Sequence, residues 1–299
     1  MDIKEKIQSL CENVRFDEEM KKHTTFRIGG TADIFCEPKD EIELKALISY
    51  IKENNLEYVI LGNGSNVLVS DEGIRGIVIK IGEKMNEVKV LGECIFAKSG
   101  ALISKVSRIA QKEGLEGLEC LSGIPASIGG AVYMNAGAYG AQMEDVLEEV
   151  TFLTDDGKIK TLPKEELDLG YRKSIFSKNG GIILSCTMKL KKGDKAIIEE
   201  KMSELTKRRV EKQPLEFPSA GSTFKRPEGY FAGKLIEDSG LKGYSSGGAK
   251  ISEKHAGFVI NFNNAKAEDV LAVIDHAKKT VYEKFNVKIE PEIKFLGEF

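Results

Sequence analysis

The sequence predicts a mixed α+β fold built from more than one compact unit, and three observations support this. The chain has 299 residues, which exceeds the usual size of a single domain. Some segments repeat apolar residues at helical spacing, whereas others are short β-branched runs between Gly, Asn and Asp. Hydrophobic residues make up 41% and charged residues 30%, as in ordinary globular proteins.

Two helices are expected near the N-terminus. Residues 3–14 place Ile, Leu, Cys and Val side chains on one helical face, so the helix is expected to include Cys11 and Val14. Residues 40–54 repeat this pattern, and Asp40 with Glu43 predicts a capping box at the start.

Three further helices are expected along the chain. They span residues 101–113, 196–212 and 264–285. Gly114 is expected to end the first in a left-handed cap, and Pro214 follows the end of the second.

Short runs rich in Val, Ile, Leu and Thr predict strands. They lie at residues 58–62, 66–69, 76–81, 87–92, 146–154 and 181–191. A last strand is expected at 287–297, where Pro291 requires an edge position or a bulge. Alternation would place Glu290, Glu292 and Lys294 on one face of it.

Composition also excludes several classes of protein. The five cysteines are odd in number and widely spaced, which argues against a disulfide framework and a zinc site, so we expect them to be buried apolar residues. A net charge of −3 gives no general attraction to nucleic acid or anionic lipid. No apolar run suits a bilayer span or a signal peptide, so a cytoplasmic location is expected.

Glycine is concentrated in three windows, residues 62–76, 117–140 and 221–248. They hold 17 of the 30 glycines, where an even spread would place about seven. Tight turns are the ordinary explanation for any one window. Three windows together favour a function, because missing side chains let backbone N–H groups approach phosphate oxygens.

The first window is neither a dinucleotide-binding Rossmann turn nor a P-loop. Gly62-Asn63-Gly64 lacks a third glycine, a strand pattern follows it instead of a helix, and no Gly-Lys-Ser/Thr is present. A turn between strands, opposite a second Gly-rich turn at 123–140, predicts a different type of pyrophosphate cradle.

Seven ordered motifs give the chain a wider resemblance. They are LGNGSNVLVSDEG, GLECLSGIPASIGGAVYMNAGAYG, LGYRKSIF, AGSTFKRP, AGKLIEDSGLKG, HAGFVIN and EPEIKFLG, from residue 61 to the C-terminus. The chain thereby resembles the UDP-N-acetylenolpyruvoylglucosamine reductase (MurB) family. The resemblance implies an α+β protein with an FAD-binding fold of the vanillyl-alcohol-oxidase (PCMH) type in two subdomains, plus a separate α/β substrate-binding domain.

The resemblance also implies domain bounds and an activity. The first FAD-binding subdomain would span 1–80 and 286–299, the second 81–206, and the substrate-binding domain 207–285. The implied reaction is reduction, through non-covalent FAD and with NADPH as reductant, of the enolpyruvyl ether of UDP-N-acetylglucosamine-enolpyruvate. The product, UDP-N-acetylmuramate, is a peptidoglycan precursor, which links the protein to cell wall biogenesis, cell shape and division. The only implied partner is this UDP-sugar.

Three catalytic residues follow from the resemblance. Hydride addition to the enolpyruvyl group builds negative charge on its carboxylate, and the adjacent carbon needs a proton. Arg172 matches the family's active-site arginine and would hold the carboxylate with two parallel donors. Ser222 matches the proton donor, and Glu292 matches the glutamate that polarises the developing enol. Each residue alone would be assigned to a turn or a solvated edge.

The resemblance also supplies binding residues. Those implied for FAD are Gly62, Asn63, Gly64, Ser65, Asn66, Gly123, Ile124, Pro125, Ser127, Ile128, Gly129, Gly130, Asn135 and Arg209. Those implied for substrate are Tyr171, Lys212, Lys225 and Lys234. The chain resembles the shorter family branch, because residues 176–182 lack an insertion with a lid tyrosine and Arg226 replaces an asparagine.

Two alternatives stay open at the level of sequence. One is another FAD oxidoreductase or oxidase of the same fold, some of which attach the flavin through His or Cys. Only His23, His255 and His276 are present, none lies in a Gly-rich cradle, and His255 is expected to be structural. The other is a nucleotide-binding module without catalysis, against which the presence of Arg172, Ser222 and Glu292 argues.

Overall fold

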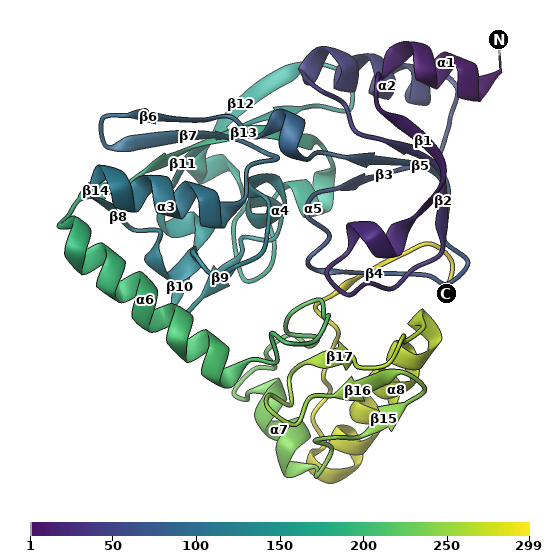
Figure 1. Cartoon of the computed structure of the whole chain (residues 1–299), viewed down its shortest axis with the longest axis vertical. Helices are drawn as coiled ribbons and strands as arrows, with labels where there is room; N and C mark the ends of the chain where they lie inside the picture. Colours follow the sequence, from purple (N-terminus) through teal and green to yellow (C-terminus); the bar gives the residue numbers. More distant parts are fainter. Residues whose placement is uncertain (1) are drawn as a thin grey trace. The chain divides into compact units, whose positions relative to one another are not determined.

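The computed structural model of the chain describes residues 2–299, which fall into two compact units (Figure 1). Unit 1 comprises Met1–Arg15, Ile34–Asn63 and Ile77–Arg208. Unit 2 comprises Phe16–Asp33, Gly64–Gly76 and Arg209–Phe299. Each unit therefore contains segments that lie far apart in the sequence. The three-part division expected from the sequence stays a prediction.

Helices are distributed over both units. The α-helices are α1 (Ile3–Leu10), α2 (Glu41–Glu53), α3 (Ile103–Glu113), α4 (Ile128–Tyr133), α5 (Phe176–Asn179), α6 (Lys195–Lys212), α7 (Ala232–Asp238) and α8 (Ala267–Phe285). Short 3₁₀ turns are η1 (Met20–His23), η2 (Glu83–Met85), η3 (Glu119–Leu121), η4 (Met143–Asp145) and η5 (Lys164–Glu166).

The strands form several small sheets. One sheet has the order β1 (Val14–Glu19), β2 (Thr31–Cys36), β5 (Ile74–Lys80) and β3 (Tyr58–Leu61). A second has the order β12 (Ile159–Pro163), β11 (Leu147–Leu153), β13 (Ile182–Lys189), β7 (Cys94–Lys98) and β6 (Val88–Leu91). A third has the order β15 (Ser245–Ser246), β16 (Ala249–Ile251) and β17 (Val259–Asn261). Two-stranded pairs join β9 (Gly137–Ala138) to β10 (Ala141–Gln142), β8 (Leu115–Glu116) to β14 (Lys191–Lys192), and β4 (Val67–Val69) to β18 (Lys294–Leu296).

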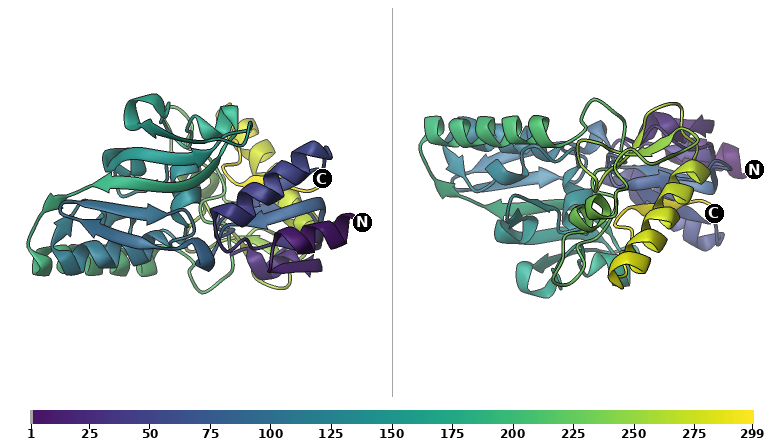
Figure 2. Two further views of the ribbon diagram at one scale, coloured as in Figure 1. Left: turned by 90° about the horizontal axis from the view of Figure 1, so that it is seen from above. Right: turned by 90° about the horizontal axis from the view of Figure 1, so that it is seen from below.

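The five-stranded sheet forms the centre of unit 1. All of its neighbouring strands pair antiparallel, and Figure 2 shows the blue and teal strands of unit 1 from two further sides. Helix α4 packs against β13 and β7. Ile103, Val106 and Ala110 of α3 recur at helical spacing and join the same buried core as Ile95 and Ala97 of β7. The apolar periods in the sequence thus generate this core directly.

Helix α8 supports the small sheet of unit 2. It packs against β15, β16 and β17, and its buried side chains include Val270, Val273, Ile274 and Ala277. These positions follow the i, i+3, i+4, i+7 spacing of one helical face. The small sheet therefore rests on a single apolar helix face.

Most predicted helices and their caps are confirmed. Asp40 accepts hydrogen bonds from the backbone N–H groups of Ile42 and Glu43 at the start of α2. The Glu43 carboxylate accepts from Lys39 N, so the reciprocal half of the capping box reaches one residue further out than expected. Gly114 ends α3 with φ +69°, the left-handed cap that its sequence position predicts.

The predicted N-terminal helix is wrong at its end. Helix α1 stops at Leu10, Cys11 is extended, and Val14 begins β1. Asn13 O accepts a hydrogen bond from Glu37 N, so pairing with the β2 segment replaces the last helical turn. A long-range backbone contact of this kind leaves no local signal.

The predicted C-terminal strand is also wrong over most of its length. Only β18 is regular, at its C-terminal end, and Pro291 instead forms an isolated antiparallel bridge with Phe224. The segment changes partner along its length, because residues 290–292 pair with residues 223–225 whereas Lys294–Leu296 pair with β4, so no continuous ladder forms. Continuous alternation therefore does not place Glu290, Glu292 and Lys294 on one strand face.

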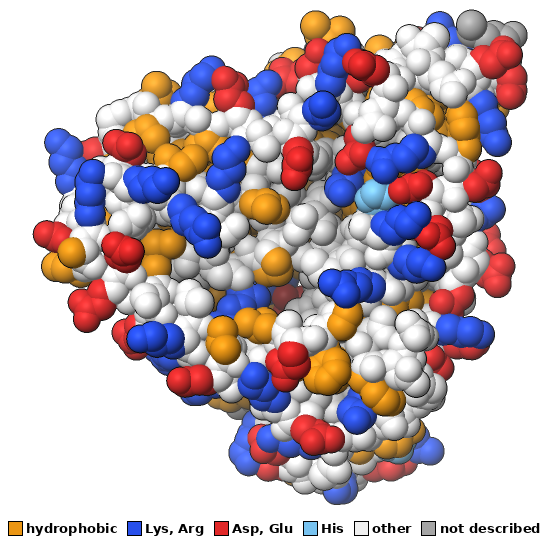
Figure 3. Space-filling view, in the orientation of Figure 1, with side chains coloured by type: hydrophobic (Ala, Val, Ile, Leu, Met, Phe, Trp, Pro, Cys, Tyr) orange, Lys and Arg blue, Asp and Glu red, His pale blue; other side chains and the backbone are white. Residues whose placement is uncertain are grey.

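The composition also makes predictions about surface charge, membrane spans and cysteine burial. The face drawn in Figure 3 carries basic and acidic side chains interspersed, in keeping with a net charge of −3. Within residues 2–299 no helix is long and apolar enough to cross a membrane. Cys11, Cys36 and Cys186 are buried as expected, whereas Cys94 and Cys120 are half-buried.

Candidate active site

The first two residues of the first glycine window, Gly62 and Asn63, lie in unit 1, directly after β3. A side chain at Gly62 would clash with Ser127 Oγ, so the backbone of this turn touches the start of α4. Asn63 Nδ2 donates a 2.6 Å hydrogen bond to Pro125 O. Two segments some sixty residues apart in sequence, both predicted to form a pyrophosphate cradle, therefore lie together.

The second glycine window is not only a turn, which corrects the expectation from its sequence. Ser127 begins α4 and its hydroxyl accepts from Gly130 N, so Gly129 and Gly130 lie in a helix. Glycine weakens a helix, but Gly129 is packed too closely for a side chain, since an added Cβ would lie 2.9 Å from Ser99 Cβ. Close packing, rather than chain reversal, explains Gly129.

The preceding residues form the loop that leads into α4. Gly123 and Pro125 are exposed, whereas Ile124 is half-buried. Ile128 is buried, and its backbone N–H donates to Ala101 O at 2.7 Å. This loop thus has an exposed backbone on one side and is anchored by α4 on the other.

Unit 1 passes a simple test for holding a diphosphate. A side chain at Gly62 would clash with Ser127 Oγ, so the backbone of this turn lies directly beside the positive end of the α4 dipole. The first N–H groups of α4 are already used, since Ile128 N donates to Ala101 O and Gly129 N to Ser99 O. Ser99 Oγ is buried and has no hydrogen-bond partner, so it is the polar group at the start of α4 that an anionic ligand could satisfy. No spacing pattern in the sequence marks Ser99.

The rest of the first window, Gly64–Gly76, lies in unit 2. Gly64 has φ +63°, and a side chain there would clash with His23 O. Gly64 O accepts from Thr25 N at 3.0 Å. Ser65 follows, half-buried, and Asn66 Nδ2 donates to Glu292 O at 3.4 Å. The predicted flavin turn therefore contacts the segment that carries a predicted catalytic residue.

Two of the three predicted catalytic residues, Ser222 and Glu292, lie on neighbouring segments of unit 2. Glu292 N donates to Thr223 O at 2.8 Å, and Lys225 N donates to Glu290 O at 2.8 Å. These bonds flank the Phe224–Pro291 bridge and make the two segments antiparallel. Ser222 and Glu292 are seventy positions apart in the sequence, so local spacing does not show that they are neighbours.

Thr223 is a supporting residue that sequence reasoning missed. It is buried, its hydroxyl accepts from Val259 N at 2.9 Å, and its own N–H donates to Gly257 O at 2.8 Å. Thr223 thus fixes the backbone next to Ser222 on three sides. Ser222 itself is exposed, with a 3.4 Å hydrogen bond from its Oγ to Phe224 O.

His255 belongs to the same support and is structural, as expected. Its Nδ1 accepts from Gly257 N at 3.1 Å, and its ring meets the Phe258 ring edge-on. Burial lowers the pKa of His255 below its usual 6.5, which keeps the ring neutral and able to accept at neutral pH.

Arg172 lies in unit 1, in a tight turn that precedes α5. Its φ is +55°, a left-handed conformation that non-glycine residues seldom adopt. Arg172 Nη2 donates to Gly137 O at 3.1 Å, and the guanidinium lies 5.1 Å from the centre of the Tyr171 ring. Tyr171 is exposed. The turn holds an arginine and a tyrosine side by side in an unusual backbone conformation.

The predicted cationic residues fall at two places in unit 2 and at the end of α6. Lys212 is exposed and Arg209 half-buried in the last turn of α6. Lys225 pairs with Glu290 at 3.0 Å, and exposed Lys234 pairs with Asp238 on α7. Surface pairs of this type contribute little to stability, so these ammonium groups remain available to an anion at small cost.

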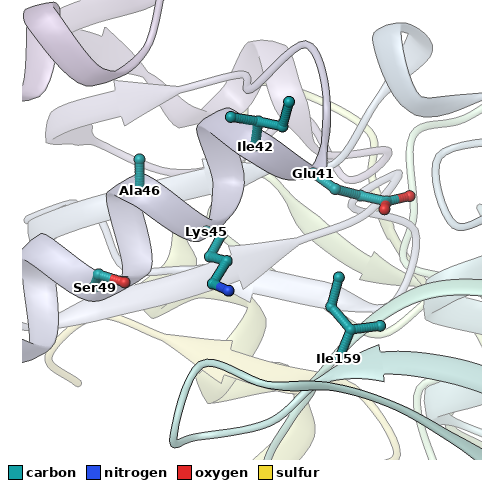
Figure 4. A pocket seen from close by; sticks show the side chains of 6 residues that line it. All are labelled: Glu41, Ile42, Lys45, Ala46, Ser49 and Ile159. Carbon is teal, nitrogen blue, oxygen red and sulfur yellow. The ribbon is translucent and has the colours of Figure 1, made fainter.

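A surface hollow elsewhere does not coincide with these residues. Glu41, Ile42, Lys45, Ala46 and Ser49 of α2 line it together with Ile159 of β12 (Figure 4). Ile42 is 79% exposed, so the hollow is open. None of the predicted site residues lines it. Within residues 2–299, moreover, no group of three His, Cys, Asp or Glu side chains is placed to hold a metal ion.

Comparison with known proteins decides the family. Residues 213–296 match the C-terminal domain of UDP-N-acetylenolpyruvoylglucosamine reductase, and residues 32–163 match an FAD binding domain. UDP-N-acetylenolpyruvoylglucosamine reductase of Clostridium novyi (strain NT) is 52% identical over 300 residues, covering 100% of this chain and 97% of that protein. The chain belongs to the UDP-N-acetylenolpyruvoylglucosamine reductase family. The namesake of Clostridioides difficile (strain 630) is 49% identical over 287 residues, covering 96% and 94%.

Solved structures agree with the family at the level of fold. A crystal structure of UDP-N-acetylenolpyruvylglucosamine reductase (MurB) from Thermus caldophilus matches with a TM-score of 0.81 and 37% identity, covering 95% of this chain and 98% of that chain. A Phl p 4 variant described as a glucose oxidase matches with a TM-score of 0.50 and 12% identity, covering 65% and 45%, which shows the fold alone.

Membership of the UDP-N-acetylenolpyruvoylglucosamine reductase family confirms the expected fold class. The chain is an α+β flavoprotein enzyme with an FAD-binding fold, and FAD is its cofactor. The residues of unit 1 described above fit the diphosphate of that cofactor. The role of each predicted site residue stays a proposal.

Proposed function

We propose that the protein catalyses the NADPH-dependent reduction of UDP-N-acetylglucosamine-enolpyruvate to UDP-N-acetylmuramate, a step of peptidoglycan precursor synthesis. The observation that carries this proposal is the contact of three segments in unit 2. Glu292 N donates to Thr223 O beside Ser222, and Asn66 of the flavin turn donates to Glu292 O. An acid, a carboxylate and a flavin-binding turn lie within one hydrogen-bonded group.

The chemistry divides between the cofactor and the side chains. Bound FAD would supply the redox chemistry, through which hydride from NADPH would reach the terminal carbon of the enolpyruvyl group. Arg172 holds the substrate carboxylate, and its planar guanidinium stabilises the charge that grows there with two parallel donors. Ser222 gives its proton to the adjacent carbon. Glu292 polarises the enol and orients the carboxylate end of the substrate.

The remaining predicted residues bind the two ligands. Arg209 reaches the cofactor, and Lys212, Lys225 and Lys234 supply positive charge for the substrate diphosphate. Tyr171 donates a hydrogen bond to the substrate. A UDP-sugar is then the only partner required, and the reaction takes place in the cytoplasm, where NADPH and nucleotide sugars are available.

Non-covalent attachment of the flavin is part of the proposal. Each histidine of the chain has a structural partner. His23 pairs with Glu18 at 2.8 Å, His255 accepts from Gly257 N, and the His276 ring stacks on Tyr244 at 3.9 Å. We therefore assign none of the three histidines as an attachment point for the isoalloxazine ring. Acid precipitation should leave the yellow colour in the supernatant, and colour retained by the pellet would contradict non-covalent binding.

The decisive test separates the two half-reactions in Ser222→Ala. Flavin reduction by NADPH should stay within about twofold of the unchanged protein, because it needs no proton from Ser222. Reoxidation by the enolpyruvyl substrate should slow on the order of 10³-fold. Stopped-flow absorbance of the flavin measures both steps.

Exposed Ser245 on β15 provides the matched control. Ser245→Ala should change neither half-reaction. If both half-reactions slowed alike in Ser222→Ala, the role of Ser222 as proton donor would be wrong. If the unchanged protein consumed NADPH only with oxygen and never with the enolpyruvyl substrate, the proposed reaction itself would fail and an oxidase of the same fold would be favoured.

A further inference from the structure

The Arg172 turn is closed by its own backbone hydrogen bonds and is also contacted from outside. Gly170 N and Lys173 O, and Lys173 N and Gly170 O, are joined by 3.2 Å hydrogen bonds across the turn. A left-handed arginine costs roughly 1 kcal/mol of local strain. Such a conformation persists only where neighbouring groups impose it, so the contacts of this turn identify what positions the arginine.

Three contacts to the turn come from one short segment, residues 133–137, at the end of α4. Ser174 Oγ donates to Tyr133 O at 2.8 Å, and Ser174 is fully buried. Arg172 Nη2 donates to Gly137 O at 3.1 Å. Asn135 lies between these two contacts. The second glycine window therefore has two parts, of which only the first, up to Gly130, faces the predicted cradle.

Asn135 provides the central contact. It is fully buried and has φ +42°, a conformation that asparagine tolerates better than most residues. Its Nδ2 donates to Gly170 O at 3.1 Å and to Glu144 Oε2 at 3.3 Å. Its Oδ1 accepts from Glu144 N at 2.9 Å. Both amide protons are thus used within the protein, which leaves the side chain no donor for a cofactor.

Glu144 completes the group and keeps the amide oriented. Its carboxylate also accepts from Gln142 Nε2 at 2.9 Å, and Gln142 lies on β10, next to the β9 residue Gly137. An added Cβ at Gly137 would lie 2.6 Å from Ala141 O, so this hairpin is packed closely. The turn carrying Arg172 therefore rests on a small, fully hydrogen-bonded base.

We propose that Asn135 is a positioning residue for Arg172, rather than a ligand of FAD as its sequence motif suggests. It holds the carbonyl of Gly170 and so fixes the turn from which the guanidinium reaches the substrate carboxylate. A displacement of about 1 Å in such a group can cost roughly 10²-fold in rate. The kinetic part of this inference rests on the proposed function, whereas its structural part does not.

The test uses Asn135→Asp in the FAD-loaded enzyme. Aspartate has the same shape and can still accept from Glu144 N, but it cannot donate to Gly170 O and it faces the Glu144 carboxylate. Amide hydrogen exchange of residues 170–174, followed by mass spectrometry, should become at least about tenfold faster. FAD affinity, measured by titrating apoprotein, should stay within about twofold.

The kinetic readout follows the two half-reactions. NADPH reduction of the flavin should be unchanged, whereas reoxidation by the enolpyruvyl substrate should slow on the order of 10²-fold. In Arg172→Lys the same substitution should add little, because Asn135 acts only through the arginine. Asn261→Asp, which removes donation from a buried amide to Phe26 O in unit 2, is the control for a general loss of stability. It should not alter exchange at residues 170–174.

Three outcomes would overturn the inference. Unchanged hydrogen exchange at residues 170–174 would show that Asn135 does not hold the turn, whether or not the enolpyruvyl compound is the substrate. An FAD affinity weakened tenfold or more in Asn135→Asp would show that Asn135 binds the cofactor. If the rate losses of Asn135→Asp and Arg172→Lys were fully additive, Asn135 would not act through Arg172. Failure of the unchanged enzyme to react with the substrate would instead count against the proposed function alone.

Discussion

The segments that carry Arg172 and Ser222 are built in opposite ways. Arg172 stands on a buried base in unit 1, where Asn135 and Ser174 are fully buried and each makes a hydrogen bond at 3.1 Å or less to a backbone carbonyl. Ser222 in unit 2 is exposed, and its own hydroxyl makes a 3.4 Å contact. Only the neighbouring Thr223 is fixed.

This difference follows the work proposed for each group. An arginine that stabilises growing charge must be oriented before the reaction, because its benefit depends on fixed geometry. A serine that gives up a proton must reach the substrate and must not be tied to a strong acceptor beforehand. A rigid base for Arg172 and an accessible hydroxyl for Ser222 therefore each suit the role proposed for that residue.

The largest expected effect is at Arg172, which stands on the buried base in unit 1. Arg172→Lys keeps the charge but removes the planar pair of donors. Reoxidation of the flavin by the enolpyruvyl substrate should slow about 10²- to 10³-fold, while flavin reduction by NADPH stays unchanged. Single-turnover absorbance measures both rates. Exposed Arg108→Lys on α3 is the control, and a comparable loss there would show that the effect is not specific to the turn.

A smaller effect is expected at the cradle. Gly62→Ala places a Cβ against Ser127 Oγ, so the N-cap of α4 or the turn must move. We expect FAD affinity to weaken about fivefold, which corresponds to the ~1 kcal/mol that a lost N-cap typically costs. Titration of apoprotein with FAD measures this. Gly82→Ala, whose Cβ would lie 3.5 Å from Glu37 Oε1, should bind FAD normally, and equal losses in both variants would contradict the argument.

The smallest expected effect is a pH-dependent change in stability caused by His255, which supports the backbone beside Ser222. Burial lowers the pKa of His255 in the folded protein below 6.5. Above pH 6.5 the ring is neutral in both the folded and the unfolded state, so His255 does not reduce the free energy of unfolding there. As pH falls below 6.5 the unfolded state takes up a proton first, so stability declines until the folded pKa is passed. His255→Asn offers a neutral acceptor to Gly257 N at every pH. Urea unfolding at pH 7.5 and 5.5 should show a smaller decline in the variant, and an equal decline would remove His255 from the explanation.

Elements that depend on local signals were predictable from the sequence. The helix over residues 101–113 with its Gly114 cap, and the central strand β13, follow from apolar spacing and backbone preferences. The helix at 3–14 was overpredicted because Asn13 O pairs with Glu37 N, a partner that local spacing does not reveal. The strand at 287–297 was overpredicted because residues 290–292 and Lys294–Leu296 pair with different segments, residues 223–225 and β4.

The candidate site was predictable only in its composition. The glycine windows and the family motifs named Arg172, Ser222 and Glu292, but no spacing linked residue 222 to residue 292 or identified Thr223 as their support. Those relations depend on antiparallel pairing between distant segments, which has no counterpart in sequence spacing. The roles of the three residues themselves stay predictions until the half-reactions are measured.

The sequence by itself determined the fold class, the family and the residue types available for chemistry, because helical periods, glycine windows and ordered motifs are local properties of the chain. Tertiary structure alone decided which groups each of these residues contacts. It divided the second glycine window into a helix start beside Gly62 and a base beneath Arg172, and it engaged the amide of Asn135 with Gly170 O and Glu144. The physical reason is that a buried hydrogen bond requires two partners at fixed distance and angle, and only the folded chain brings such partners together.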